Sequence, residues 1–274
     1  MKAVHITADE NITYRVEPLA LPTAHRKGVV DAEGYRRQAR GAMPRANFNP
    51  NQSDSVRAIV LSDGTFTGLA SQPGALLTFV VSGDLTLPTG TPAAGLSQLS
   101  HLEPGDILLT DQHSSSVPIE ARNGCRLMQL RVSADWPGEG AEVQQPGTLI
   151  PRPPGRMPKL KRIYKGEDDK AYYSELPLLF PEVMNQWGTP HPISGFRLLC
   201  WEEGSMDWHP CVTNQLAITL SGEMEMEVGG GGGAVETFHA GDICLSEDRA
   251  GQGHIGRFRG VVHVVIMVLG TGSL

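Results

Sequence analysis

Two stretches, LTFVVSGDLTL (Leu77 to Leu87) and LAITLSGEMEM (Leu216 to Met226), decide how this sequence folds. Both run from leucine through apolar residues to Ser-Gly, an acidic residue and alternating apolar positions. A second pair follows in the same order: EPGDILLTDQ (Glu103 to Gln112) and HAGDICLSED (His239 to Asp248). The glycines of the two landmarks are 22 residues apart in the first copy and 19 apart in the second. Two landmarks that recur in order at similar spacing predict two copies of one domain.

A segment rich in proline and glycine, Pro137 to Pro158, separates the two copies. Ten of its 22 residues are Gly or Pro. This composition is typical of a connector, because proline lacks a backbone donor and glycine is costly to order. We therefore expect an N-terminal segment plus a degenerate barrel over 1–136, a linker over 137–158 and a second barrel over 159–274. The alternative is a long loop inside a single domain.

The patterning within each copy is that of β-strands. Residues 223–228 alternate glutamate with apolar side chains, a period of two with one wet face. The run GVVHVVIMVL (Gly260 to Leu269) is rich in β-branched residues, and the five glycines of 229–233 suit a hairpin tip. Only 31–40 and 180–187 suggest short helices. The sequence thus predicts an all-β fold of two small barrels or sandwiches.

Composition narrows the class of protein. The chain has 274 residues, a net charge of −7, and 52 residues that are Gly or Pro. An acidic chain disfavours nucleic-acid binding, and no apolar run approaches the ~20 residues of a membrane span. The N-terminus lacks the apolar stretch of a signal peptide, and the four cysteines show no CxxC spacing. We expect a cytoplasmic protein with reduced thiols and neither nucleic-acid nor membrane partners.

Candidate metal ligands gather before the Ser-Gly turn of the second copy. His209 and Cys211 are two residues apart, so on a strand their side chains face the same way. Gln215 has the same parity, and His254 follows the second landmark. These four side chains could converge on one divalent ion.

The pattern resembles the cupin superfamily, whose first motif has His-x-His, an acidic residue four on and a glycine seven beyond. Its second motif opens with Gly-Asp and ends in His. This sequence has His209, Cys211, Gln215, Gly222, Gly241, Asp242 and His254 at those places. The strings W-H-x5-Q and G-D-x4-E-D-x5-H also resemble uncharacterised cupin-domain proteins. The resemblance covers 159–269 well and 56–132 more weakly. It implies a bicupin with jelly-roll barrels, but this fold hosts many reactions and binding roles.

The first copy lacks the ligand residues. The equivalent positions hold Ala70, Gln72, Leu76 and Pro118, and the nearby His113 aligns with an arginine. We expect this half to be metal-free and structural, although an apolar barrel could still hold a small ligand.

Each candidate also has a structural interpretation. The histidines could be hydrogen-bonded core residues, Cys211 a small buried residue, and Gln215 an orienting rather than a ligating group. Glu247, with Asp248, could act as a general base, or the two could simply form the turn before His254.

Three functions remain open. The first is a mononuclear enzyme that uses Zn, Fe or Cu on a small molecule, with oxygen-dependent (dioxygenase-like) chemistry considered first, then isomerisation or decarboxylation. The second is a bicupin that binds a small molecule without metal or catalysis. The third is a structural or storage role. The two copies are expected to form a pseudo-dimer within the chain, and a homodimer of chains is left open.

Overall fold

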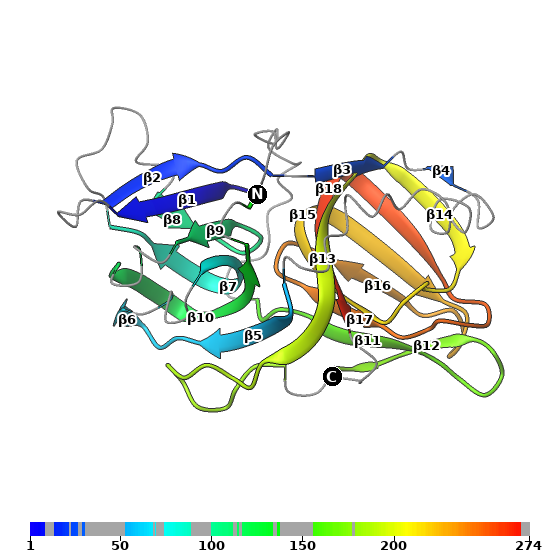
Figure 1. Ribbon diagram of the computed structural model, residues 1–274. Coiled ribbons are helices and arrows are strands. Elements are labelled where there is room, and N and C mark those ends of the chain that lie inside the picture. The colour runs from blue at the N-terminus through cyan, green and yellow to red at the C-terminus, as the bar shows by residue number, and fades with distance from the viewer. Residues whose placement is uncertain are drawn as a thin grey trace. The chain divides into compact units, whose positions relative to one another are not determined.

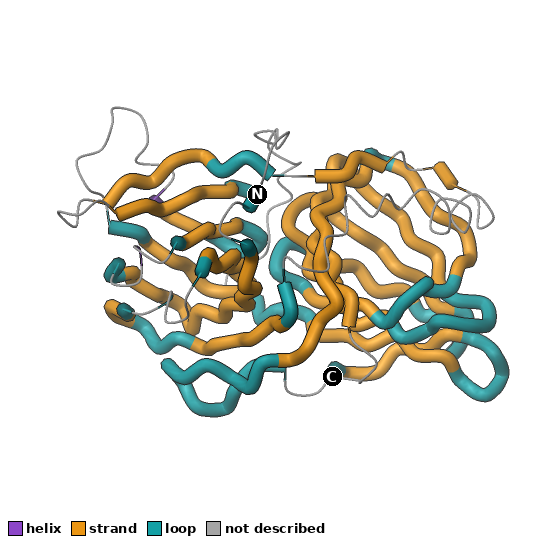
Figure 2. The backbone as a smooth tube through the Cα atoms, viewed as in Figure 1, coloured by secondary structure: helices purple, strands orange, loops and turns teal. Residues whose placement is uncertain are grey.

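The computed structural model describes residues 1–8, 14–21, 23–26, 29–30, 53–67, 69, 74–88, 100–111, 114, 117–133, 136–137, 156–176 and 179–269. Within these ranges the regular elements are β-strands (Figures 1 and 2), which confirms the all-β class. No helix in this described part is long and apolar enough to cross a membrane. The chain divides into two compact units.

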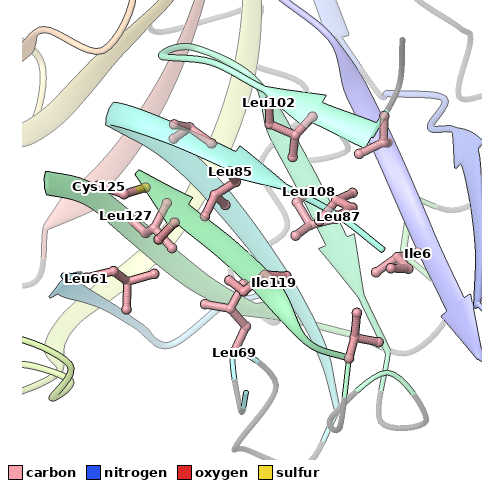
Figure 3. Close-up of a cluster of buried hydrophobic side chains, with 14 of the residues drawn as sticks. Ile6, Leu61, Leu69, Leu85, Leu87, Leu102, Leu108, Ile119, Cys125 and Leu127 are labelled. Atoms are coloured by element: carbon pink, nitrogen blue, oxygen red, sulfur yellow. The ribbon is translucent and has the colours of Figure 1, made fainter. Parts of the chain in front are cut away.

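Unit 1 comprises Met1–Pro22, Asn51–Pro146 and Leu179–Pro192. Its strands are β1 (Ala3–Ala8), β2 (Tyr14–Pro18), β5 (Ser55–Val60), β6 (Gly64–Phe66), β7 (Ala75–Thr86), β8 (His101–Leu102), β9 (Ile107–Thr110) and β10 (Ile119–Val132). β10 pairs antiparallel with β5, β6 and β7, while β9 joins β7 to β1. The interior holds a cluster of buried aliphatic side chains that point toward one another (Figure 3).

Unit 2 comprises Thr23–Pro50, Gly147–Leu178 and Ile193–Leu274. Its strands are β3 (Thr23–Arg26), β4 (Val29–Val30), β11 (Leu160–Lys165), β12 (Ala171–Glu175), β13 (His191–Trp201), β14 (Gly204–His209), β15 (Gln215–Val228), β16 (Val235–Phe238), β17 (Ile243–Ser246) and β18 (His254–Leu269). β18 pairs antiparallel with β13, β14 and β15, while β17 joins β15 to β11.

The two quoted stretches occupy equivalent strands, as predicted. β7 and β15 each pair with the last long strand of their unit, and each also pairs with the strand that carries the second landmark. In both ladders the register shifts at the Ser-Gly step. Gly83 and Gly222 have φ of 69° and 72°, and a Cβ on either would lie under 3 Å from backbone of the facing strand. The repeat in the sequence is therefore a repeat of one barrel.

The aspartate of each Gly-Asp landmark clamps the first strand of its barrel. Asp106 accepts hydrogen bonds from the backbone N–H groups of Lys2 and Glu103. Asp242 accepts the equivalent pair, from Lys159 at 2.8 Å and His239 at 2.9 Å. Both carboxylates are buried, so these bonds replace lost water. They fix the parallel pairs β1–β9 and β11–β17.

The two units are not the contiguous blocks 1–136 and 159–274 that the sequence suggested. Residues 23–26 and 29–30 group with unit 2, where β3 pairs in parallel with β13 and β4 with β14. The segment 179–192 groups with unit 1, because the N–H groups of Asn185 and Gly188 donate to carbonyls of Val60 and Ala58. Most of the expected linker, 138–155, lies outside the described residues.

The helix expected over 180–187 is wrong. These residues form turns, and Asn185 has φ of 60°, which a right-handed helix does not allow. Backbone donors there bond to β5 instead of to the preceding turn. The other expected helix, 31–40, lies outside the described residues.

The bend at Gly222 predicts a specific sensitivity to an added methyl group. Gly222→Ala should lower the free energy of unfolding by about 2–5 kcal/mol, because it combines a positive φ with a clash against backbone. Gly231 is a matched control: its φ is 66°, but an added Cβ there meets nothing within 4 Å. Gly231→Ala should therefore cost only about 1 kcal/mol. Equal losses for both variants in urea unfolding would contradict the close approach at Gly222.

Candidate metal centre

His209 and His254 face each other across a pair of strands. His209 ends β14, His254 begins β18, and the two are direct partners in the ladder. Their ring centroids are 4.5 Å apart with an interplanar angle of 56°. Gly253 permits this approach, since a Cβ there would lie 2.0 Å from the His209 carbonyl oxygen. Both imidazoles are buried, and the structure brings together the histidine pair that the sequence placed in one site.

Hydrogen bonds set the tautomer of both rings. His209 Nδ1 lies 2.7 Å from the backbone oxygen of Asp207, which can only accept, so Nδ1 carries the proton. His254 Nδ1 lies 2.7 Å from Oδ2 of Asp248 and donates to that carboxylate. Burial, reinforced by the neighbouring His254, lowers the pKa of His209 to about 4. His209 is therefore neutral at pH 7, with its lone pair on Nε2.

Cys211 and Gln215 lie beside this pair. The Cys211 N–H donates to the Asp248 carbonyl at 3.2 Å, which places the residue against the turn before β18. Gln215, the first residue of β15, donates from Nε2 to Cys211 Sγ at 3.3 Å. Burial, with the nearby Asp248 carboxylate adding to it, raises the pKa of the Cys211 thiol well above its usual value. Without a bound cation, this residue is a thiol at pH 7.

The tightest group of donor atoms contains Cys211, Asp248 and His254. One ligand atom from each lies within 4.8 Å of the others, and all three residues are buried. His209 stands beside the group against His254. Asp248, weighed in the sequence only with Glu247 as a base, thus becomes a candidate ligand.

Two buried oxygens at this place have no hydrogen-bond partner among the described residues: Asp248 Oδ1 and Gln215 Oε1. An unpaired buried oxygen costs free energy and calls for an ion or a water molecule. Sulfur, imidazole nitrogen and carboxylate oxygen together are the donors that Zn²⁺ and similar ions take. The residues present therefore fit a divalent metal.

Glu247 does not join this group. Its carboxylate pairs with Arg162 of β11, and its N–H donates to the Ile163 carbonyl. The carboxylate that contacts His254 directly is that of its neighbour, Asp248. The parity of a strand could not separate the two, because β17 ends at Ser246.

In unit 1 only part of the equivalent set can be placed. Leu76 is buried in β7, and Pro118 precedes β10. Ala70, Gln72 and His113 lie outside the described residues. A separate group, Asp84, His101 and Glu103, is largely exposed and belongs to the solvent face.

No family model matches this chain, and no curated protein does. Solved structures that it resembles include a cupin 2 conserved barrel domain protein from Leptotrichia buccalis, with 12% identity over 80% of this chain and 86% of the other and a TM-score of 0.34. Another is a mutant oxalate decarboxylase of Bacillus subtilis, with 16% identity, coverage of 81% and 71%, and a TM-score of 0.28. A third is a protein of unknown function of the DUF861 family from Pseudomonas syringae, with 15% identity, coverage of 98% and 100%, and a TM-score of 0.32. No function is inferred for this chain from similarities with TM-scores this low. The two-barrel fold follows from the strand registers described above.

The low pKa of His209 predicts an acid-dependent loss of stability in the metal-free protein. Its ordinary pKa of 6.5 falls to about 4 on folding. As the pH drops from 6.5 toward 4, His209 becomes protonated in the unfolded chain but stays neutral in the folded chain. The free energy of unfolding should therefore fall by on the order of 2–3 kcal/mol. Urea unfolding at about pH 7 and about pH 4.5 measures this loss, and His209→Gln should remove it. An identical pH dependence in variant and parent would contradict a neutral buried His209.

Proposed function

We propose that unit 2 is a mononuclear, metal-dependent enzyme that acts on a small molecule. The observation that carries the proposal is the buried group of Cys211, Asp248 and His254, with the Asp248 Oδ1 oxygen lacking a partner among the described residues. No lysine or arginine in the described part of the chain pairs with this carboxylate, whose one ion-pair partner there is His254. A buried carboxylate with so little compensation is stabilised by a cation.

His254, Cys211 and Asp248 would hold the ion, with His209 and Gln215 beside it. When bound, a divalent ion supplies Lewis acidity toward a carbonyl or a water molecule. The thiol and imidazoles suit Zn, Fe or Cu. Two histidines with one carboxylate are also the donor set of non-haem iron oxygenases. For that reason oxygen-dependent chemistry ranks first, ahead of isomerisation and decarboxylation.

The residues around the ion would orient its ligands and position a substrate. Asp248 Oδ2 accepts from His254 Nδ1 and so fixes the orientation of this imidazole. His209, neutral at pH 7, contributes a second Nε2 lone pair without adding positive charge. Gln215, whose Nε2 is occupied by Cys211, has its amide oxygen available to orient a water molecule or a substrate hydroxyl.

The second candidate is a metal-free barrel that binds a small polar molecule. It is favoured by the raised pKa of Cys211, which keeps the thiol protonated and already engaged with Gln215. In that case the oxygens of Asp248 and Gln215 would meet the hydroxyl or amide groups of the ligand. Metal binding separates the two functions.

Metal titration tests the proposal. Adding Zn²⁺, Fe²⁺ or Cu²⁺ to chelator-treated protein should raise the melting temperature, with one ion bound per chain. Saturation at about 100 times the dissociation constant is worth ~2.7 kcal/mol. Asp248→Asn should abolish this shift, while Glu247→Gln, the same change one residue away, should preserve it. No shift with any of these ions would favour the metal-free function, and two ions per chain would mean that unit 1 also binds metal.

Two of the three buried cysteines of unit 2 provide a second test. Cys211 and Cys244 are 2% and 1% exposed, but only Cys211 belongs to the donor group. Cys211→Ser should therefore weaken metal retention by at least about tenfold, because a hydroxyl is a poor replacement for a thiolate. Cys244→Ser should retain metal like the parent during dialysis against a chelator. Equal retention in both variants would remove Cys211 from the site and leave the histidines and Asp248.

A further inference from the structure

Unit 1 buries an arginine without an acidic partner. Arg57 of β5 is 8% exposed, and both its Nε and Nη2 donate to one neutral oxygen, Oε1 of Gln129. No carboxylate of the described residues pairs with it. Burial accordingly lowers the pKa of Arg57 to about 10, so the group is still a cation at pH 7. A buried charge of this kind is costly unless something of opposite charge approaches it.

Arg57 is one end of a polar row that crosses three strands. Gln129 of β10 is the ladder partner of both Arg57 and Thr78. Its Nε2 donates to Thr78 Oγ1 and to the Leu69 carbonyl, each at 3.0 Å. Gln129 is thus held with its oxygen toward the guanidinium, which rules out an amide flip as an alternative.

The equivalent row of unit 2 is different. There the middle of the ladder holds Ile266, paired with Arg197 on one side and Ala217 on the other. The barrel therefore does not require a polar side chain at the positions of Gln129 and Thr78, since unit 2 has Ile266 and Ala217 there. The glutamine and threonine are a feature of unit 1 alone.

A second donor beside the guanidinium lacks an acceptor. The Trp187 ring lies over Arg57, with the guanidinium carbon 3.8 Å from its centroid. The indole Nε1 is buried and has no hydrogen-bond partner among the described residues. Nη1 of Arg57 likewise makes no hydrogen bond to them. Trp187 Nε1 and Arg57 Nη1 are thus neighbouring donors without an acceptor among the described residues, and the Arg57 group is charged.

We propose that this row, Arg57, Gln129 and Thr78 with Trp187, binds the carboxylate of a small organic acid. The carboxylate would accept from Arg57 Nη1 and Trp187 Nε1 and would neutralise the guanidinium. The remainder of the ligand would be apolar, because Ile59 and Leu127, two residues from Arg57 and Gln129 on the same faces of their strands, belong to the buried aliphatic cluster. Leu69 and Leu127 appear in that cluster in Figure 3. This site is separate from the donor group of unit 2.

Benzoate and hexanoate are the probes, with benzamide and inorganic phosphate as controls. Calorimetry and tryptophan fluorescence, both with a chelator present, should detect binding of the two acids and little or none of benzamide or phosphate. Gln129→Glu supplies the guanidinium with an internal carboxylate, so it should weaken benzoate binding by at least about tenfold. Trp187→Phe keeps the ring, removes the N–H and should weaken binding several-fold.

Gln252→Glu is the control variant, because it adds the same charge at an exposed position of unit 2. Benzoate affinity should be unchanged in it. The proposal is overturned if neither acid binds at millimolar concentration, or if Gln129→Glu binds benzoate as the parent does. Phosphate or benzamide binding as tightly as benzoate would also overturn it. Each result is independent of metal binding in unit 2.

Discussion

The curl of β15 at Gly222 is the constraint on which the site of unit 2 depends. A straight strand of 14 residues would separate Gln215 from Val228 by about 40 Å. Both ends of β15 nevertheless lie beside the donor group of Cys211, Asp248 and His254. Gln215 donates to Cys211 Sγ, while Val228 pairs with His254, which shares a donor group with Cys211. The bend falls where the register shifts on either side of Ser221, and only glycine can follow Ser221 at so close a backbone approach.

The same scaffold carries different chemistry in the two units. Gly83 repeats the bend of Gly222, and Asp106 repeats the clamp of Asp242, so the backbones are built alike. The side chains that fill them diverge. Unit 2 collects imidazoles, a thiol and a carboxylate, a donor set that suits a cation. Unit 1 pairs its buried Arg57 with the neutral Gln129, whereas the arginine at the equivalent place in unit 2, Arg197, is the ladder partner of Ile266.

The features predictable from the sequence are those set by local geometry. The repeat identified the two barrels, because a glycine at a tight bend and an aspartate on backbone N–H groups have few substitutes. Strand parity was expected to place His209 and Cys211 on one side, but β14 ends at His209, so Cys211 lies beyond the strand. Parity is lost after Ser246, where β17 ends, so the sequence could not choose between Glu247 and Asp248. Long-range pairing was also invisible: the parallel pairing of β3 with β13 gives unit 2 a strand from the N-terminal part of the chain. Arg57 belongs to no sequence motif, because its hydrogen-bond partner, Gln129, is 72 residues away in the sequence.

X-ray absorption at the zinc edge, on protein loaded with one equivalent of Zn²⁺, tests the central claim most directly. The donor group of unit 2 predicts one sulfur at about 2.3 Å together with nitrogen or oxygen at about 2.0–2.2 Å, including the outer-shell scattering of imidazole. Cys211→Ser should remove the sulfur shell and leave the imidazole signal. A shell of oxygen atoms alone, with neither sulfur nor imidazole scattering, would contradict a metal centre built from Cys211, Asp248 and His254.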